Sequence, residues 1–185
     1  GGIHRACRAG ARRPDPAVRL RVPGGSREAF DDAVHGRVAQ DIAGEVGDFV
    51  LHRADGFWAY QLAVVVDDAD QGVDQVVRGD DLVPTTPRQV LLQRLLGLPT
   101  PEYLHVPLVL GPDGERLAKR HGAVGLGDRL AAGDTPEGVI GMLAASLDLA
   151  EPGERLTADE VLERFDPDRI PTRPWVLDPS DLPAG

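Results

Sequence analysis

The sequence is poor in cysteine and contains no long apolar run. Its one cysteine among 185 residues excludes an internal disulfide; it either indicates a reducing compartment or carries no information about the compartment. No run of about 18 apolar residues occurs, so we expect no membrane-spanning helix. The first residues also lack the apolar core of a signal peptide. Because the chain opens with Gly1 rather than methionine, we expect a processed or incomplete piece of a longer protein.

Positive charge is also scarce. The chain has 20 basic and 30 acidic residues, and its net charge of −10 argues against a protein that wraps nucleic acid. The exception is a basic cluster near the start, formed by Arg5, Arg8, Arg12, Arg13, Arg19 and Arg21. We interpret this cluster as a solvated, poorly ordered arm. Contact with RNA phosphates, which would give a salt-dependent affinity, is the alternative.

Apolar residues are plentiful enough for a packed core. They make up 42% of a chain whose length is typical of one domain with a small appendage. Between residues 49 and 110, expected strands alternate with expected helices, which indicates an α/β domain with a mainly parallel sheet. Beyond Leu126 the pattern becomes helical. The proline-rich end from Pro171 to Gly185 is typical of an extended segment.

Periodicity and turn residues place the expected elements. We expect strands at Val18–Val22, Phe49–Arg53, Val73–Arg78 and Tyr103–Leu110. We expect helices at Ala59–Ala69, Gln89–Leu96, Pro136–Leu147 and Ala158–Phe165. A threonine cap at Thr85 or Thr86, ahead of a proline, favours the start of the second helix. Gly97 favours its end.

The most informative stretch runs from Asp55 to Gly122. It carries Tyr60 and Arg78, eighteen positions apart, at the ends of an apolar run. Without further context, Tyr60 is more often a packed core tyrosine with a satisfied hydroxyl. Arg78 can likewise pair with the nearby Asp80 and Asp81.

The same stretch ends in a basic loop. A tight-turn signal at Asp113 and Gly114 precedes Arg116, Lys119 and Arg120. A mobile ammonium beside a pocket can stabilise charge that develops on phosphates. Taken alone, such a loop is more often a solvated surface feature.

These residues belong to a longer pattern that resembles a known family. The run YQLAVVVDDADQGVDQVVRGDDLVPTTPRQ and the later RLAKR resemble the second half of the class I glutamyl-tRNA synthetase catalytic domain. The similarity is closer still to the family's short members, which lack an anticodon-binding domain and act on queuosine of tRNA(Asp). It covers Phe30 to Leu126 strongly and the region up to Trp175 more weakly. It implies the C-terminal half of a Rossmann-like α/β catalytic domain with a small helical appendage.

The resemblance implies roles for the residues that match the family's motifs. The second ATP signature, usually written KMSKS, is matched by Arg116, Leu117, Ala118, Lys119 and Arg120. Lys119 would be the catalytic residue and lie against the ATP phosphates while glutamyl-adenylate forms. Arg116 keeps the charge of the first lysine, whereas Ala118 lacks the hydroxyl of the usual serine. Tyr60 and Arg78 match the positions that bind the substrate glutamate.

The match also has departures. The family's first ATP signature, a histidine-containing turn, has no counterpart here, so we expect the isolated chain to be inactive or nearly so. Short members often carry a zinc module as well. Cys7 falls where the last cysteine of that module would lie, but Ile3 replaces its tyrosine and the earlier cysteines are absent. One thiol cannot form a tetrahedral site, so we expect no zinc in this chain.

Two acidic pairs have more than one interpretation. We interpret Asp67 and Asp68 as solvated or structural acids rather than as a magnesium site, because adjacency alone does not define one. We interpret Asp80 and Asp81 as helix caps rather than as contacts to the ATP ribose. Trp175 is expected to hold the proline-rich end against the body of the protein.

These observations predict three parts: residues 1–16, a flexible remnant of the zinc-module region; residues 17–126, a partial class I catalytic domain; and residues 127–185, a helical segment like the family's stem-contacting part, with its tail. The implied activity is activation of glutamate with ATP and magnesium, followed by transfer to tRNA(Asp), in a cytoplasmic monomer. A fragment that charges tRNA(Glu) and a non-catalytic RNA-interacting fragment are the alternatives.

Overall fold

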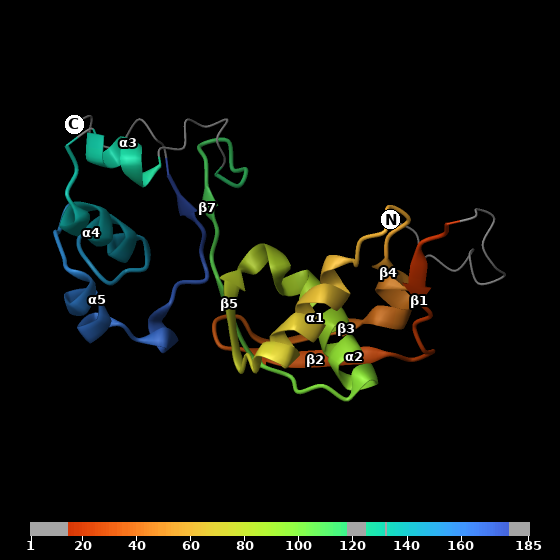
Figure 1. Cartoon of the computed structure of the whole chain (residues 1–185). Helices are drawn as coiled ribbons and strands as arrows, with labels where there is room; N and C mark the ends of the chain where they lie inside the picture. The colour runs from red at the N-terminus through yellow and green to blue at the C-terminus, as the bar shows by residue number, and fades with distance from the viewer. Residues whose placement is uncertain (1–14, 118–124, 132, 178–185) are drawn as a thin grey trace. The chain divides into compact units, whose positions relative to one another are not determined.

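The structure consists of two compact units. The computed structural model describes residues 15–117, 125–131 and 133–177. Unit 1 comprises residues 1–105, and unit 2 comprises residues 106–185 (Figure 1). Among the helices in the described ranges, none combines the length and the apolar character needed to cross a membrane. The part boundaries expected from the sequence, at 16/17 and 126/127, stay predictions.

The main sheet of unit 1 has four strands in the order β3-β2-β6-β5. Their bounds are Arg27–Asp32 for β2, Gly36–Asp41 for β3, Gln75–Gly79 for β5 and Glu102–Val106 for β6. β2 and β3 form an antiparallel hairpin, and β2 pairs in parallel with β6 so that Asp32 lies opposite Tyr103. Such a mixed sheet, with an antiparallel edge strand, is common in α/β domains.

The β2–β3 hairpin was missed by the sequence analysis because the buried face of β2 is mostly acidic. Glu28, Phe30 and Asp32 alternate with more exposed residues and are each about 95% buried. Only one of the three is apolar, so the strand does not show the apolar alternation that marks a half-buried strand.

A second, two-stranded sheet lies at the start of unit 1. β1 (Val18–Leu20) and β4 (Phe49–His52) pair antiparallel, which confirms two expected strands. A π-helical turn over Ile42–Val46 connects β3 to this region. The hydrophobic core here consists of Val22, Ile42, Phe49, Val65, Leu91 and Leu92.

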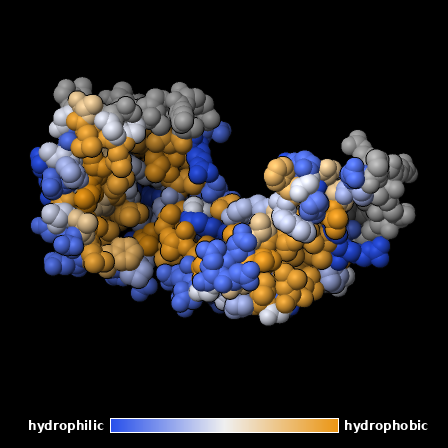
Figure 2. Space-filling view, viewed as in Figure 1, coloured by the Kyte–Doolittle hydropathy of each residue, from blue (hydrophilic) through white to orange (hydrophobic). Residues whose placement is uncertain are grey.

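Two helices of unit 1 confirm the expected ones. α1 (Tyr60–Gln71) and α2 (Thr86–Leu96) both end at a glycine with a φ of 69°, Gly72 and Gly97. A side chain is strained at this φ, which explains why glycine ends both helices. The first two turns of α2 are buried almost all round, whereas Leu95 and Leu96 at its end are about half exposed. Figure 2 shows hydrophobic surface over this end of α2.

The start of α2 differs from the prediction. Thr85 occupies the N-cap position, but its hydroxyl donates to Leu82 O at 2.8 Å and not to the helix. A 3₁₀ helix over Asp80–Thr85 leads directly into α2, so the backbone is already ordered without a side-chain cap. Asp80 and Asp81 lie inside that 3₁₀ helix, whose N-cap is Gly79, so their predicted capping role is wrong.

The described part of unit 2 combines a small sheet with helices. β7 (Val109–Leu110) and β8 (Trp175–Val176) pair in parallel. The helices are α3 (Leu126–Ala131), α4 (Pro136–Ser146), α5 (Ala158–Arg164) and a 3₁₀ turn at Pro167–Arg169. Ala144, Leu149 and Leu156 form the core between α4 and α5.

The expected continuous strand over Tyr103–Leu110 is wrong. β6 ends at Val106 and β7 begins at Val109, and Pro107 between them has no N–H to donate to a ladder. The second piece pairs instead with the C-terminal segment, where Trp175 N donates to Leu108 O at 3.0 Å.

Gly141 in α4 has no room for a side chain. A Cβ at this position would lie 1.8 Å from the carbonyl oxygen of Glu154. Because backbone atoms must move to relieve this overlap, Gly141→Ala should destabilise unit 2 by about 1–3 kcal/mol or more. Urea unfolding followed by Trp175 fluorescence, in a Trp58→Phe background, measures the change.

Gly138→Ala in the same helix is the matched control. Its Cβ would meet only Thr135 Oγ1, at an ordinary 3.5 Å. Alanine has the better helix propensity, so this variant should be neutral or more stable by up to about 1 kcal/mol. Equal effects of the two variants would contradict the close approach at Gly141.

Candidate active site

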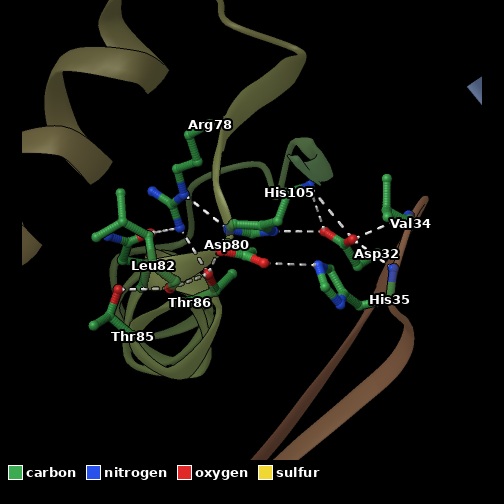
Figure 3. A network of polar contacts seen from close by, with 10 residues as sticks. Asp32, Val34, His35, Arg78, Asp80, Leu82, Thr85, Thr86 and His105 are labelled. Carbon is green, nitrogen blue, oxygen red and sulfur yellow. Dashed lines mark hydrogen bonds and ion pairs between the residues drawn. The ribbon is translucent and has the colours of Figure 1, made fainter. Parts of the chain in front are cut away.

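Arg78 is the central residue of the candidate site. It lies near the end of β5, and its guanidinium makes three hydrogen bonds to neighbouring side chains (Figure 3). Nε donates to His105 Nε2 at 2.9 Å, and Nη2 donates to Thr86 Oγ1 and Gln89 Oε1, both at 2.7 Å. The guanidinium carbon also lies 5.4 Å from the centre of the Tyr103 ring, within cation–π range. None of these partners is an acid.

Asp32 and His105 continue the chain of contacts behind Arg78. His105 Nδ1 lies 2.6 Å from Asp32 Oδ2, and both side chains are fully buried. The other carboxylate oxygen, Oδ1, accepts hydrogen bonds from Val34 N and His35 N at 3.0 and 2.9 Å. His105 N also donates to Oδ2, at 3.1 Å. The pairing of β2 with β6 brings these two residues together from opposite parts of unit 1.

The contacts fix the tautomer of His105. A guanidinium has only donors, so His105 Nε2 must accept from Arg78 and cannot carry a proton. The ring proton is therefore on Nδ1, from which it is donated to the carboxylate of Asp32. Thr86 Oγ1 lies 3.2 Å from the same Nε2, but its single proton is directed at Leu82 O, 3.0 Å away. His105 is thus a neutral imidazole between a carboxylate and a guanidinium.

The protonation equilibria agree with this assignment. Burial lowers the pKa of His105 below its ordinary value against the opposing effect of Asp32, and the charge of Arg78 lowers it further. Burial alone would raise the pKa of Asp32, but its hydrogen bonds from His105, His35 and Val34 outweigh burial and lower it. The ionised carboxylate and the neutral ring are the favoured forms.

A second arm of contacts leads from Arg78 to the start of α1. Gln89 accepts from Arg78 through Oε1 and donates through Nε2 to Gln61 Oε1 at 2.8 Å. Gln61 directly follows Tyr60, the first residue of α1. Tyr60 is 50% exposed, so it is not the packed core residue of the alternative interpretation. The two residues expected to bind glutamate are therefore linked through two glutamines.

The alternative pairing of Arg78 with the following aspartates does not occur. The described partners of Arg78 include neither Asp80 nor Asp81. Asp80 instead faces His35, and its Oδ2 lies 4.0 Å from His35 Nε2. No described hydrogen bond uses Arg78 Nη1, so the uncommitted donors of this half-buried cation are at that nitrogen.

The residues around Arg78 were missed by the sequence analysis. They are Asp32, Gln61, Thr86, Gln89 and His105. His105 gave one usable signal, a single titratable residue within the apolar run LHVPLVL. Asp32 gave none, because its partner is 73 positions away in the chain.

The basic loop is described only at its start. Gly111 N donates to Glu115 O at 2.8 Å and Leu117 N donates to Val109 O at 2.9 Å, which confirms the expected turn around Gly114. Arg116 is exposed on this hairpin. Ala118, Lys119 and Arg120, like Cys7, lie outside the described residues. The described residues contain no group of three His, Cys, Asp or Glu side chains that could hold a metal, and Asp67 and Asp68 lie on α1.

Comparison with known proteins places these residues in a family. Residues 4–183 match the family model of class I tRNA synthetases (E and Q), catalytic domain. A protein of Xanthomonas oryzae named glutamyl-Q tRNA(Asp) synthetase is 65% identical over 130 residues, which cover 69% of this chain and 42% of that protein. A protein of the same name from Nocardia farcinica is 55% identical over 168 residues, 90% of this chain and 50% of that protein. The chain spans about half the length of the curated relatives it matches.

A solved structure supports the fold. A glutamate tRNA ligase from Elizabethkingia meningosepticum, in complex with its amino acid, superimposes with a TM-score of 0.73 at 24% identity. The match covers 86% of this chain and 36% of that one. Together with the family match, it confirms the expected α/β class I catalytic fold.

The neutral state of His105 predicts a pH-dependent stability. Unfolded His105 binds a proton near pH 6.5, its ordinary value, whereas the folded ring stays neutral to lower pH. The unfolded state thus binds more protons just below pH 6.5, and the free energy of unfolding should fall as the pH is lowered from 7 to 5.5. The slope can reach about 1.4 kcal/mol per pH unit for one proton.

His105→Gln provides the comparison, measured by urea unfolding at each pH. The variant lacks this titration, so its stability should fall less steeply over the same range. Glu28, whose pKa is raised by burial against the effect of Arg94, is present in both proteins and cancels. Identical slopes would show that the pKa of His105 is the same in the folded and the unfolded protein.

Proposed function

Because the chain belongs to the class I tRNA synthetases (E and Q) through their catalytic domain, we propose that it forms part of an enzyme that activates glutamate with ATP and transfers it to a tRNA. The observation that carries this proposal is Arg78. It is a half-buried cation whose described partners are all uncharged groups, with Nη1 uncommitted beside them. Such a cation is suited to bind an external carboxylate.

We infer how glutamate would bind from the donors that Arg78 has left uncommitted. The Nε and Nη2 donors are used by His105, Thr86 and Gln89, so the substrate carboxylate would be met by Nη1. The Tyr60 hydroxyl would add the further contact expected from the sequence, since Tyr60 is half exposed at the start of α1.

ATP would be met by the signature residues Arg116–Arg120. Lys119 is the proposed catalytic residue, because an ammonium there can stabilise charge on the α-phosphate and on the departing pyrophosphate. Magnesium would arrive with ATP and bind its phosphates. We propose no zinc, since Cys7 alone cannot supply four ligands.

We propose queuosine of tRNA(Asp) as the acceptor, because the relatives described above are named glutamyl-Q tRNA(Asp) synthetase. The same chemistry would serve transfer to tRNA(Glu). An enzyme that uses tRNA acts where tRNA is found, and we propose a cytoplasmic monomer.

Glutamate-dependent exchange of pyrophosphate into ATP tests the activity. It should be measured for the 185-residue chain and for the chain joined to the N-terminal half of the Xanthomonas oryzae relative. We expect exchange by the joined protein and little by the chain alone. Transfer of labelled glutamate to tRNA(Asp) or tRNA(Glu) then identifies the acceptor. An absence of exchange with glutamate in the joined protein would overturn the proposed activity.

Lys119→Ala should lower the turnover of pyrophosphate exchange about 100-fold in the joined protein, with little change in the KM for glutamate. A group that meets charge developing on phosphates acts mainly in the transition state. Steady-state kinetics separates the two effects, and equal losses in turnover and in glutamate binding would argue against this role. Lys119→Arg, which keeps the charge, should retain more turnover than the alanine variant.

The chain offers a direct check on the same residue. Lys119 is its only lysine, so an amine-directed reagent can modify only this side chain and the terminal amine. ATP should slow the modification of Lys119 but not that of the terminus, as measured by mass spectrometry of peptides. Equal protection of both amines by ATP would indicate a general salt effect.

Arg78→Ala should raise the KM for glutamate about tenfold or more and leave the KM for ATP near its original value. The reason is the loss of the charged donor to the substrate carboxylate. Arg37→Ala is the matched control, because Arg37 is an exposed arginine of unit 1 that pairs with Asp31. An unchanged KM for glutamate in Arg78→Ala would remove this residue from the proposed pocket.

A further inference from the structure

We propose that Asp32 and His105 are positioning residues for Arg78, which hold its guanidinium by a neutral imidazole so that its charge stays available to the substrate carboxylate. This inference rests on the proposed binding of glutamate by Arg78. The inference adds Asp32 of β2 and His105 of β6 to the site, as residues that would contact neither glutamate nor ATP. Figure 3 shows the three side chains in line, with Asp32 farthest from the start of α2.

The imidazole is held by one carboxylate from two sides. Asp32 Oδ2 accepts from both the backbone N–H and the ring Nδ1 of His105, and Oδ1 is held by two N–H groups of the turn after β2. With its backbone and its ring tied to the same oxygen, His105 has little freedom to rotate. Its Nε2 lone pair therefore has a fixed direction, and Arg78 Nε–H follows it.

A second buried acid on the same strand shows what the imidazole changes. Glu28 lies four residues before Asp32 on the same buried face of β2, and it forms an ion pair directly with Arg94. A direct pair of this kind neutralises the guanidinium. In the Asp32–His105–Arg78 arrangement the carboxylate contacts only the ring, and the guanidinium meets only uncharged acceptors. Orientation is thus obtained without a direct counter-charge.

The carboxylate also selects the tautomer on which this depends. An asparagine at position 32 could present its NH₂ to His105 Nδ1, and the ring proton would then move to Nε2. Two donors, Nε2–H and Arg78 Nε–H, would face each other across 2.9 Å. The arginine would have to leave its position.

Asp32→Asn in the 185-residue chain tests the inference. ¹⁵N NMR of the imidazole rings distinguishes a protonated from an unprotonated nitrogen, and the His105 signals are those lost in His105→Asn. We expect unprotonated Nε2 in the wild type and protonated Nε2 in Asp32→Asn. The apparent Kd for glutamate, from the shifts of the Arg78 Nε–H and Tyr60 signals, should rise about tenfold or more.

Glu28→Gln is the matched control, since it removes a buried charge from the same face of the same strand. It should leave the His105 tautomer unchanged and the glutamate Kd within about twofold. If the wild-type chain binds no glutamate, the proposed binding of glutamate by Arg78 in this chain fails, whereas the proposed activity is decided by exchange in the joined protein. The tautomer alone then decides whether Asp32 acts on His105. An unchanged tautomer in folded Asp32→Asn, or equal losses of affinity in both variants, would overturn the inference.

Two substitutions of His105 keep the inference testable if Asp32→Asn does not fold. His105→Gln can place an acceptor near the former Nε2 position, whereas His105→Asn keeps only a donor to Asp32 and removes the acceptor for Arg78. We expect the glutamine variant to bind glutamate more tightly than the asparagine variant, with similar stabilities in urea. The opposite order of affinities would show that the contact between His105 and Arg78 does not position the arginine.

Discussion

The buried carboxylate of Asp32 is the constraint on which the arrangement of unit 1 depends. A fully buried charge without a directly bonded cation must be compensated by hydrogen-bond donors, because desolvation is costly. Here the donors come from the turn after β2 and from both N–H groups of His105. Compensation therefore requires β6 to lie beside β2 in one register. The same register sets the position of His105 and, through it, that of Arg78.

Helix α2 connects this polar region to the hydrophobic core. One of its faces carries Thr86, Gln89 and Gln93, which bond to Arg78, Gln61 and Tyr103. Its other face carries Leu91 and Leu92, which pack with Val65 of α1. Apolar packing thus holds the helix in place, while hydrogen bonds from the same helix hold the arginine. The buried amides add direction rather than hydrophobic stabilisation.

The sequence predicted the parts of the fold that depend on local patterns. The two helices of unit 1, their glycine ends and the turn at Gly114 follow from periodicity and backbone preference. β2 was missed because acids occupy its buried face, and Pro107 divided a strand that the apolar run suggested was continuous. Tyr60 and Arg78 came from the family resemblance. Their setting could not be predicted, because its key contact joins residues 73 positions apart.

The separation of Asp32 and His105 by 73 positions affects when the site forms during folding. The backbone hydrogen bonds of α1 and α2 join residues close in sequence, whereas the bond between Asp32 and His105 closes a long loop and bears the entropy of that closure. Contacts between segments far apart in sequence form slowly, and parts of a folded protein can open before the rest unfolds. A partial opening that parts β2 from β6 would release Arg78 while both helices remain folded. Loss of the arginine's orientation would then precede any loss of helical signal during gradual denaturation.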